Sequence, residues 1–289
     1  MAENQELKPL VVTSVSEMQR IASELRRAGK RIGLVPTMGA LHLGHMSLAV
    51  AAKEDADVVI VSDFVNPTQF APGEDYDKYP RTLDADVTLL QQIEVDYVFA
   101  PQPSEMYPDG FNAKVHIGGV TELLEGEFRP THFDGVATVV LKLFNMTQAD
   151  VAFFGQKDYQ QTLVIRKLVR DLNLPIEIVV CPIIRERDGL ALSSRNQYLS
   201  STERQEALVL NKALEKAEEL IRSGERDAPV VIDAMRAIIA TAPSAVVDYA
   251  YIGDPESLAE LSRIAGDVVV LLAVRVGKTR LIDNRIIRR

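Results

Sequence analysis

The sequence predicts an α/β protein, a Rossmann-like doubly wound parallel sheet followed by a smaller C-terminal α+β domain. From about residue 30 to residue 185, short apolar runs rich in β-branched residues alternate with helical periodicity. This alternation is typical of parallel strands that helices cover on both faces. The pattern then changes after about residue 187. We therefore expect two domains, over 1–187 and 188–289.

The elements of the first domain follow one another in βα order. Strands are expected over 31–37, 57–64, 95–100, 149–154 and 176–181, and helices over 40–53, 84–94, 134–147 and 158–172. Ligands of such sheets bind beyond the carboxyl ends of the strands. Functional residues are therefore sought where these strands end.

The second domain begins with a helix whose start is marked in the sequence. Ser200 and Glu203 have the spacing of a capping box, which predicts a long helix to about residue 222. The remaining elements are a second helix to about residue 240 and strands over 246–252, 268–276 and 279–284. Gly277 and Lys278 form the expected two-residue hairpin turn. This reading excludes a P-loop at the VGKT sequence there.

Composition and charge exclude several classes of protein. The 289 residues include 32 Lys and Arg against 41 Asp and Glu, a net charge of −9. So acidic a chain is not expected to bind nucleic acid through its overall field. One Cys excludes an intramolecular disulfide framework. Without a secretory leader or an apolar run of ~18 residues, a cytoplasmic protein with no membrane partner is expected.

The strongest functional signal is PTMGALHLGH at 36–45. A helix is expected to begin near Ala40, where unpaired backbone N–H groups and the helix dipole favour phosphate. His42 and His45 lie three residues apart on one helical face and can donate hydrogen bonds to phosphate oxygens. Gly44 lets a flat base or ribose approach the backbone. A single His would be read as an ordinary surface residue, but the combination favours a nucleotide site.

Four segments together resemble the pantothenate synthetase family of the HxGH nucleotidylyltransferase superfamily. They are PTMGALHLGH (36–45), FVNPTQFAPGEDYDKYPRT (64–82), FFGQKDYQQ (153–161) and DGLALSSRNQYLS (188–200). The resemblance spans nearly the whole chain. It implies an ATP-dependent condensation of (R)-pantoate with β-alanine through a pantoyl-adenylate, with release of AMP and pyrophosphate. It also implies a Mg²⁺ requirement and a homodimer.

The resemblance further implies which residues contact ATP. They are Met38, Gly39, Ala40, Leu41, His42, Leu43, Gly44 and His45; Gly155, Gln156, Lys157 and Asp158; and Ile184, Leu192, Ser193, Ser194 and Arg195. Of these, His42, His45, Lys157 and Arg195 are the expected catalytic residues. Adenylate formation concentrates negative charge, which hydrogen-bond donors and cations stabilise.

The substrate and metal ligands are expected elsewhere. The resemblance implies that Gln69 contacts both pantoate and β-alanine and that Gln161 contacts pantoate. An amide both donates and accepts, which suits a hydroxy acid and an amine. Asp86 is the candidate Mg²⁺ ligand, although acids at a helix start more often complement the helix dipole.

Two other functions remain open at this point. One is another HxGH adenylyltransferase, whose product would be dinucleotide-like. The other is a nucleotide-binding regulator without turnover, which would need neither Gln69 nor Gln161. Release of AMP that depends on both small substrates separates all three.

Overall fold

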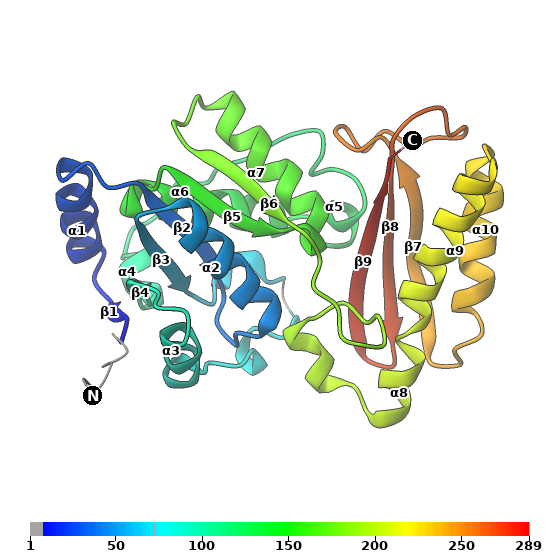
Figure 1. Cartoon of the computed structure of the whole chain (residues 1–289), viewed down its shortest axis with the longest axis horizontal. Helices are drawn as coiled ribbons and strands as arrows, with labels where there is room; N and C mark the ends of the chain where they lie inside the picture. The colour runs from blue at the N-terminus through cyan, green and yellow to red at the C-terminus, as the bar shows by residue number, and fades with distance from the viewer. Residues whose placement is uncertain (1–7, 72, 289) are drawn as a thin grey trace, which may run out of the picture. The chain divides into compact units, whose positions relative to one another are not determined.

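The computed structural model describes residues 8–71 and 73–288 (Figure 1). The first seven residues, on which the expectation of no leader partly rests, lie outside the described residues. The chain divides into two compact units. The first holds the described residues up to Gly155 and then Gln160–Pro182, and the second holds Gln156–Tyr159 and the residues from Ile183 onward. The predicted boundary at 187/188 therefore falls just inside the second unit.

The first unit is built on a six-stranded parallel sheet, as predicted. Its strands are β1 (Leu10–Val12), β2 (Ile32–Thr37), β3 (Val58–Asp63), β4 (Tyr97–Phe99), β5 (Val151–Gly155) and β6 (Glu177–Cys181). They lie in the order β1-β4-β3-β2-β5-β6. The chain runs from β2 outward to β4 on one side, then returns to β5 and β6 on the other. The order thus reverses between β2 and β5. Of the six strands of this sheet, the sequence analysis did not predict β1, which is three residues long.

Helices cover both faces of this sheet. One face packs against α1 (Val15–Arg27), α6 (His132–Thr147) and α7 (Tyr159–Asp171), and the other against α2 (Leu43–Asp55) and α3 (Leu83–Gln91). Successive strand residues point to opposite faces, so Leu34 belongs to the α6 side and Val35 to the α2 side. This explains why the strands read as continuous apolar runs. Two single-turn helices, α4 (Pro103–Met106) and α5 (Glu125–Phe128), lie between β4 and α6.

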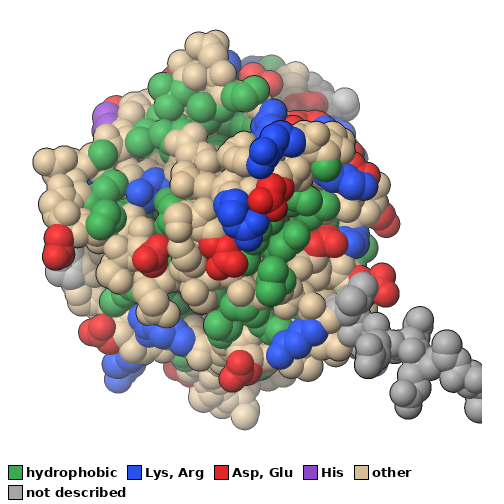
Figure 2. All heavy atoms as spheres, turned by 90° about the vertical axis from the view of Figure 1, so that its left-hand side faces the viewer, with side chains coloured by type: hydrophobic (Ala, Val, Ile, Leu, Met, Phe, Trp, Pro, Cys, Tyr) green, Lys and Arg blue, Asp and Glu red, His purple; other side chains and the backbone are tan. Residues whose placement is uncertain are grey.

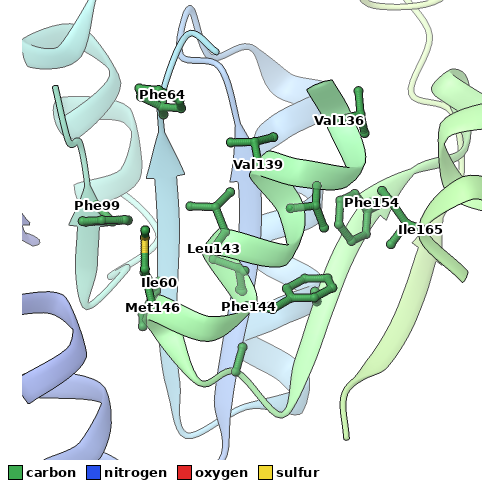
Figure 3. Close-up of a cluster of buried hydrophobic side chains, with 14 of the residues drawn as sticks. Ile60, Phe64, Phe99, Val136, Val139, Leu143, Phe144, Met146, Phe154 and Ile165 are labelled. Carbon is green, nitrogen blue, oxygen red and sulfur yellow. The ribbon is translucent and has the colours of Figure 1, made fainter. Parts of the chain in front are cut away.

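Helix α6 supplies much of the core on its side of the sheet. Val136, Val139 and Leu143 of α6 are buried in one cluster with Ile60 of β3 and Phe154 of β5 (Figure 3). Burial of such a side chain contributes about 1.5–3 kcal/mol. The core therefore holds α6 firmly against the strands whose carboxyl ends carry the candidate site.

The second unit combines three helices with an antiparallel sheet. The helices are α8 (Ser201–Glu206), α9 (Val209–Ser223) and α10 (Ala228–Ile239), and the strands, in the order β7-β8-β9, are β7 (Ala245–Gly253), β8 (Val268–Val276) and β9 (Thr279–Ile287). The capping box of Ser200 and Glu203 is confirmed, but the predicted long helix is two helices. Gly277, at φ +59°, starts the predicted hairpin turn. Strand β9 continues three residues beyond its predicted end.

The charged surface, the single cysteine and the helix lengths can be described directly. On the face drawn in Figure 2, basic and acidic side chains are interspersed, and neither sign gathers into one broad patch. Cys181 is buried. Within residues 8–71 and 73–288, no helix has the length and apolarity needed to span a membrane.

Candidate active site

The reversal of strand order places two of the predicted ATP segments after neighbouring strands. The pairing between β2 and β5 covers only Gly33 and Leu34 of β2, whereas β2 and β3 pair along six residues. The carboxyl ends of β2 and β5, at Thr37 and Gly155, lie beyond this short ladder. In open α/β sheets, ligands bind at such a switch point. The sequences that follow these two ends are the HxGH motif and GQKD.

The turn after β2 is held by a buried carboxylate. Asp86 of α3 is 2% exposed, and its two oxygens accept hydrogen bonds from the backbone N–H groups of Ala40 (3.0 Å) and Leu41 (2.8 Å). The N–H of Gly39 donates to Thr37 Oγ1 at 3.2 Å. The expectation of unpaired N–H groups here is therefore wrong. The left-handed backbone of Ala40 (φ +50°) also delays the start of α2 to Leu43.

The two histidines form a reciprocal cap at the start of α2. His42 Nδ1 accepts from the N–H of Gly44 at 3.1 Å, and His45 Nδ1 accepts from the N–H of His42 at 3.3 Å. The ring centroids lie 4.1 Å apart. Because each Nδ1 accepts, a neutral ring must carry its hydrogen on Nε2. Donation by either imidazole to a phosphate oxygen stays a prediction.

Below the turn, Asp86 pairs with a second acid. Asp63, at the end of β3, is hydrogen-bonded to Asp86, and burial together with the Asp86 charge raises the pKa of Asp63 to about 7. A Cβ on Gly39 would lie 2.4 Å from Asp63 Oδ1, and Gly39 has φ +76°, so only glycine fits there. Thr82 Oγ1 also donates to Asp86, at 2.9 Å.

These contacts bear on the candidate Mg²⁺ ligand. Each oxygen of Asp86 already accepts from the turn. No cluster of three or more His, Cys, Asp or Glu side chains suited to a metal ion occurs in the described ranges. Coordination of Mg²⁺ by Asp86 stays a prediction, while its contacts identify a second role, holding the HxGH turn.

Gln69 is fixed beside this turn by its side chain and its backbone. It is 9% exposed, its Nε2 lies 2.7 Å from Met38 Sδ, and its Oε1 accepts from Asn66 Nδ2 at 3.2 Å. Its carbonyl oxygen accepts from Arg129 Nη2 (3.2 Å) and His132 Nδ1 (2.9 Å). The first unit therefore joins Gln69 to the HxGH segment through Met38.

The two residues that hold the Gln69 carbonyl are themselves constrained. Arg129 forms an ion pair with Glu74, with N–O distances of 2.7 and 2.8 Å. Burial, and next the charge of Arg129, lowers the pKa of His132 to about 4. His132 is therefore neutral at physiological pH, with its hydrogen on Nδ1, because a carbonyl can only accept.

Asn66 is a buried polar residue beside Gln69 that the sequence analysis did not single out. It is 1% exposed, its Oδ1 accepts from Tyr107 Oη at 2.7 Å, and its Nδ2 donates to the Gly135 carbonyl at 3.2 Å. It caps the 3₁₀ turn Pro67–Gln69. An Asn directly before Pro at a strand end was the available signal, because Asn favours such turns.

The remaining predicted ATP residues lie mostly in the second unit. Gln156–Asp158 form a 3₁₀ turn. The 184–192 segment closes on itself, because Leu192 N donates to Ile184 O at 2.9 Å and Glu186 N donates to Leu190 O at 2.8 Å. Ser193 Oγ then caps a 3₁₀ helix, Ser194–Tyr198, that carries Arg195. Gln161 is half-buried in α7 and belongs to the first unit.

A doubly wound parallel sheet with the HxGH segment at its switch point is typical of a Rossmann-like nucleotide-using enzyme. The family model described as pantoate-beta-alanine ligase matches residues 10–286 of the chain. The chain therefore belongs to the pantoate-beta-alanine ligase family, and it is a ligase.

Individual relatives agree over nearly the whole length. A pantothenate synthetase of Koribacter versatilis is 52% identical over 278 residues, which are 96% of each chain. The crystal structure of pantothenate synthetase from Thermus thermophilus is similar at a TM-score of 0.91 and 46% identity, covering 96% of this chain and 98% of that one. A pantoate-beta-alanine ligase from Francisella tularensis, complexed with beta-gamma ATP and beta-alanine, gives a TM-score of 0.77 at 36% identity, over 96% and 97% of the chains.

Proposed function

We propose that the protein condenses (R)-pantoate with β-alanine in an ATP-dependent reaction that passes through a pantoyl-adenylate. Membership of the ligase family supports the substrates. The complex of the Francisella tularensis relative supports ATP and β-alanine as ligands. The observation that carries the proposal is the pair of Nε2–H donors at the β2 end, with Gln69 fixed beside them.

In the first half-reaction, a pantoate carboxylate oxygen attacks the α-phosphorus of ATP and the bond to pyrophosphate breaks. Negative charge builds on the α-phosphate and on the departing pyrophosphate. His42 and His45 donate hydrogen bonds to phosphate oxygens, and Lys157 and Arg195 supply positive charge to the triphosphate. The other contacts to ATP come from 38–44, 155–158, Ile184 and 192–194.

In the second half-reaction, the β-alanine amine attacks the acyl carbon and AMP leaves. Gln69 contacts both pantoate and β-alanine, and Gln161 contacts pantoate. Two hydrogen bonds hold the Gln69 backbone carbonyl, which fixes where its side-chain amide lies. That amide contacts Met38 Sδ and Asn66 Nδ2, and a substrate hydroxyl or carboxylate would take the place of one of these contacts.

Mg²⁺, dimerisation and location complete the proposal. Mg²⁺ is commonly held by substrate phosphates with one or two carboxylates, so it would accompany ATP, with Asp86 as the candidate ligand. No step above depends on it. The homodimer is carried over from the resemblance, and the single, free Cys181 supports a cytoplasmic location. Sedimentation of the purified protein would test the homodimer.

A substrate screen tests the function. AMP and pyrophosphate are measured with ATP and Mg²⁺ plus pantoate, β-alanine, both or neither. We expect AMP release only with both acids, and exchange of labelled pyrophosphate into ATP with pantoate alone. A dinucleotide-like product without free AMP would indicate another adenylyltransferase. Binding of ATP without turnover under any combination would indicate a regulator.

A further inference from the structure

Strand β9 carries two adjacent polar residues that are almost completely buried. Asp283 and Asn284 are each 2% exposed. A buried amide or carboxylate is costly unless its hydrogen bonds are made. The partners of these two side chains therefore indicate what the pair does. None of the roles assigned above involves either residue.

Asn284 binds the backbone of the turn that carries Lys157. Its Nδ2 donates to the carbonyl oxygens of Gln156 (3.0 Å) and Lys157 (2.9 Å), and its Oδ1 accepts from Gln156 Nε2 at 3.1 Å. One side chain thus makes three hydrogen bonds to two consecutive residues. The turn Gln156–Asp158 is fixed in place by this amide.

Asp283 anchors the other predicted ATP segment of this unit. Its two oxygens accept from Arg185 Nη1 (2.6 Å) and Nη2 (2.8 Å), and Oδ1 also accepts from the N–H of Asn284 at 2.7 Å. Arg185 Nη1 donates in turn to the Gly189 carbonyl at 3.1 Å. This bidentate pair ties the base of the 184–192 segment, which leads to Ser193 and Arg195, to β9.

We propose that Asp283 and Asn284 are positioning residues that set two ATP-binding segments, Gln156–Asp158 and Ile184–Arg195, on a single strand. The inference rests on the proposed function for the identity of the ligand. In physical terms, two neighbouring residues of β9 set the positions of Lys157 and Arg195, which lie 38 positions apart in sequence. Neither Asp283 nor Asn284 needs to touch the nucleotide for this.

The test uses Asn284→Asp and Asn284→Ala in the full-length protein. The aspartate keeps the volume and one acceptor but replaces the amide donor with a second acceptor, which faces two carbonyl oxygens. We expect the KM for ATP in pantoate-dependent pyrophosphate exchange to rise about tenfold, the factor for ~1.4 kcal/mol. The KM for pantoate should stay within about twofold of wild type. Amide hydrogen exchange over 156–159 should accelerate in the ligand-free protein.

Asp248→Ala is the matched control. Asp248 is also a buried acid of this sheet, with a side chain 4% exposed, but it binds Arg275 and Arg280 instead of either ATP segment. It should lower the melting temperature while leaving the KM for ATP and the exchange over 156–159 unchanged. That result separates positioning from general loss of stability.

Hydrogen exchange at the turn and the KM for ATP together decide whether Asn284 positions the turn for the nucleotide. If amide hydrogen exchange over 156–159 is as slow in Asn284→Asp as in wild type, the positioning proposal is overturned, whatever the enzymatic activity. Faster exchange with an unchanged KM for ATP would also overturn it, because the positioning would not serve the nucleotide. If the wild type shows no pantoate-dependent exchange of pyrophosphate into ATP, the proposed function is wrong. Amide hydrogen exchange would still decide whether Asn284 holds the turn.

Discussion

Buried side chains hold the two strand-to-helix junctions that follow β2 and β5, but they bind different backbone groups. At one junction the bound groups are N–H donors, and at the other they are carbonyl acceptors. At 38–42, a carboxylate takes up backbone N–H groups, since Asp86 accepts from Ala40 and Leu41. At 156–158, an amide takes up backbone carbonyls, since Asn284 donates to Gln156 and Lys157. Two junctions at corresponding places in the βα order thus have different backbone groups committed to protein partners.

In the proposed reaction the two segments contribute different side chains. At the first junction the N–H groups of Ala40 and Leu41 are committed to Asp86, so the segment would meet phosphate with two imidazoles that carry Nε2–H. At the second junction the segment would supply a cation, Lys157. The predictions below test whether each side chain acts as this comparison requires, beginning with the largest expected effect.

Removal of a histidine donor should cost the most. His42→Asn keeps a capping acceptor at the start of α2 but loses the Nε2–H. We expect pantoate-dependent pyrophosphate exchange to fall about 100- to 1,000-fold, as for an oxyanion-hole donor. His45→Ala should fall by a similar factor. Near-normal exchange in either variant would remove that histidine from the mechanism.

Thermal unfolding provides the control for this pair. Because the cap is retained in His42→Asn, its melting temperature should stay close to that of the wild type. His42→Ala, which loses the cap, should lose roughly 0.5–2 kcal/mol. If His42→Asn unfolds as readily as His42→Ala, a structural role accounts for the residue.

Loss of the cation in the second junction should have the next largest effect. Lys157→Ala removes a charged donor to the triphosphate, worth about 1.5–3 kcal/mol, so adenylation should slow about 10- to 150-fold. The turn itself should stay in place, because Asn284 binds its backbone. Unchanged hydrogen exchange over 156–159 would support this separation, and faster exchange would show that the Lys157 side chain also holds the turn.

The substrate amides should affect the two half-reactions unequally. Gln161→Ala should raise the KM for pantoate and lower kcat while leaving the affinity for a nonhydrolysable ATP analogue nearly intact. Gln69→Ala should in addition slow the second half-reaction, by about tenfold for one lost hydrogen bond. The measurement is the decay of preformed pantoyl-adenylate when β-alanine is added. A wild-type rate of decay in Gln69→Ala would leave that residue a pantoate contact only.

The sequence revealed the side chains of the junctions but not what holds them. Apolar runs and capping signals predicted five of the six parallel strands, the longer helices from α2 to α7 that cover them and the C-terminal hairpin, because these patterns are local. Asp86, Asp283 and Asn284 lie 45 to 128 positions from the residues that they hold, and Asp63 lies 24 positions from Gly39. Spacing along the chain carries no signal for such contacts. The occupied N–H groups of Ala40 and Leu41 were unforeseen for this reason.

The sequence analysis missed Asn66 and the helix break at Ala207–Leu208 for a different reason. Asn66 gave a local signal, but a turn Asn is common and its burial by Tyr107 and Gly135 is tertiary. The residues from Ser201 to Ser223 favour helix throughout. Ala207, at the break, and Leu210, in α9, are both buried in the core of this unit.

The smallest expected effect concerns the acid pair beneath the first junction. The pKa of Asp63 is raised from 3.8 to about 7 by burial and by Asp86. Between about pH 4 and pH 7 the folded state therefore keeps a proton that the unfolded state has released. The contribution of Asp63 to the free energy of unfolding falls as pH rises through this window. Asp63→Asn donates to Asp86 at every pH, so it should lack this loss.

Because His132 titrates in the same pH window, we compare the free energy of unfolding of the wild type with that of Asp63→Asn at each pH. The pKa of His132, lowered to about 4, makes its own contribution rise with pH up to about 6.5, against that of Asp63. Urea unfolding of wild type and Asp63→Asn, from pH 5 to pH 8, cancels the His132 part. We expect Asp63→Asn to gain at least ~1.4 kcal/mol over wild type by pH 8, the value of one pKa unit. Asp84→Asn, at an exposed site on α3, should show no such gain. Parallel curves for wild type and Asp63→Asn would mean that Asp86 holds the HxGH turn without a protonated partner.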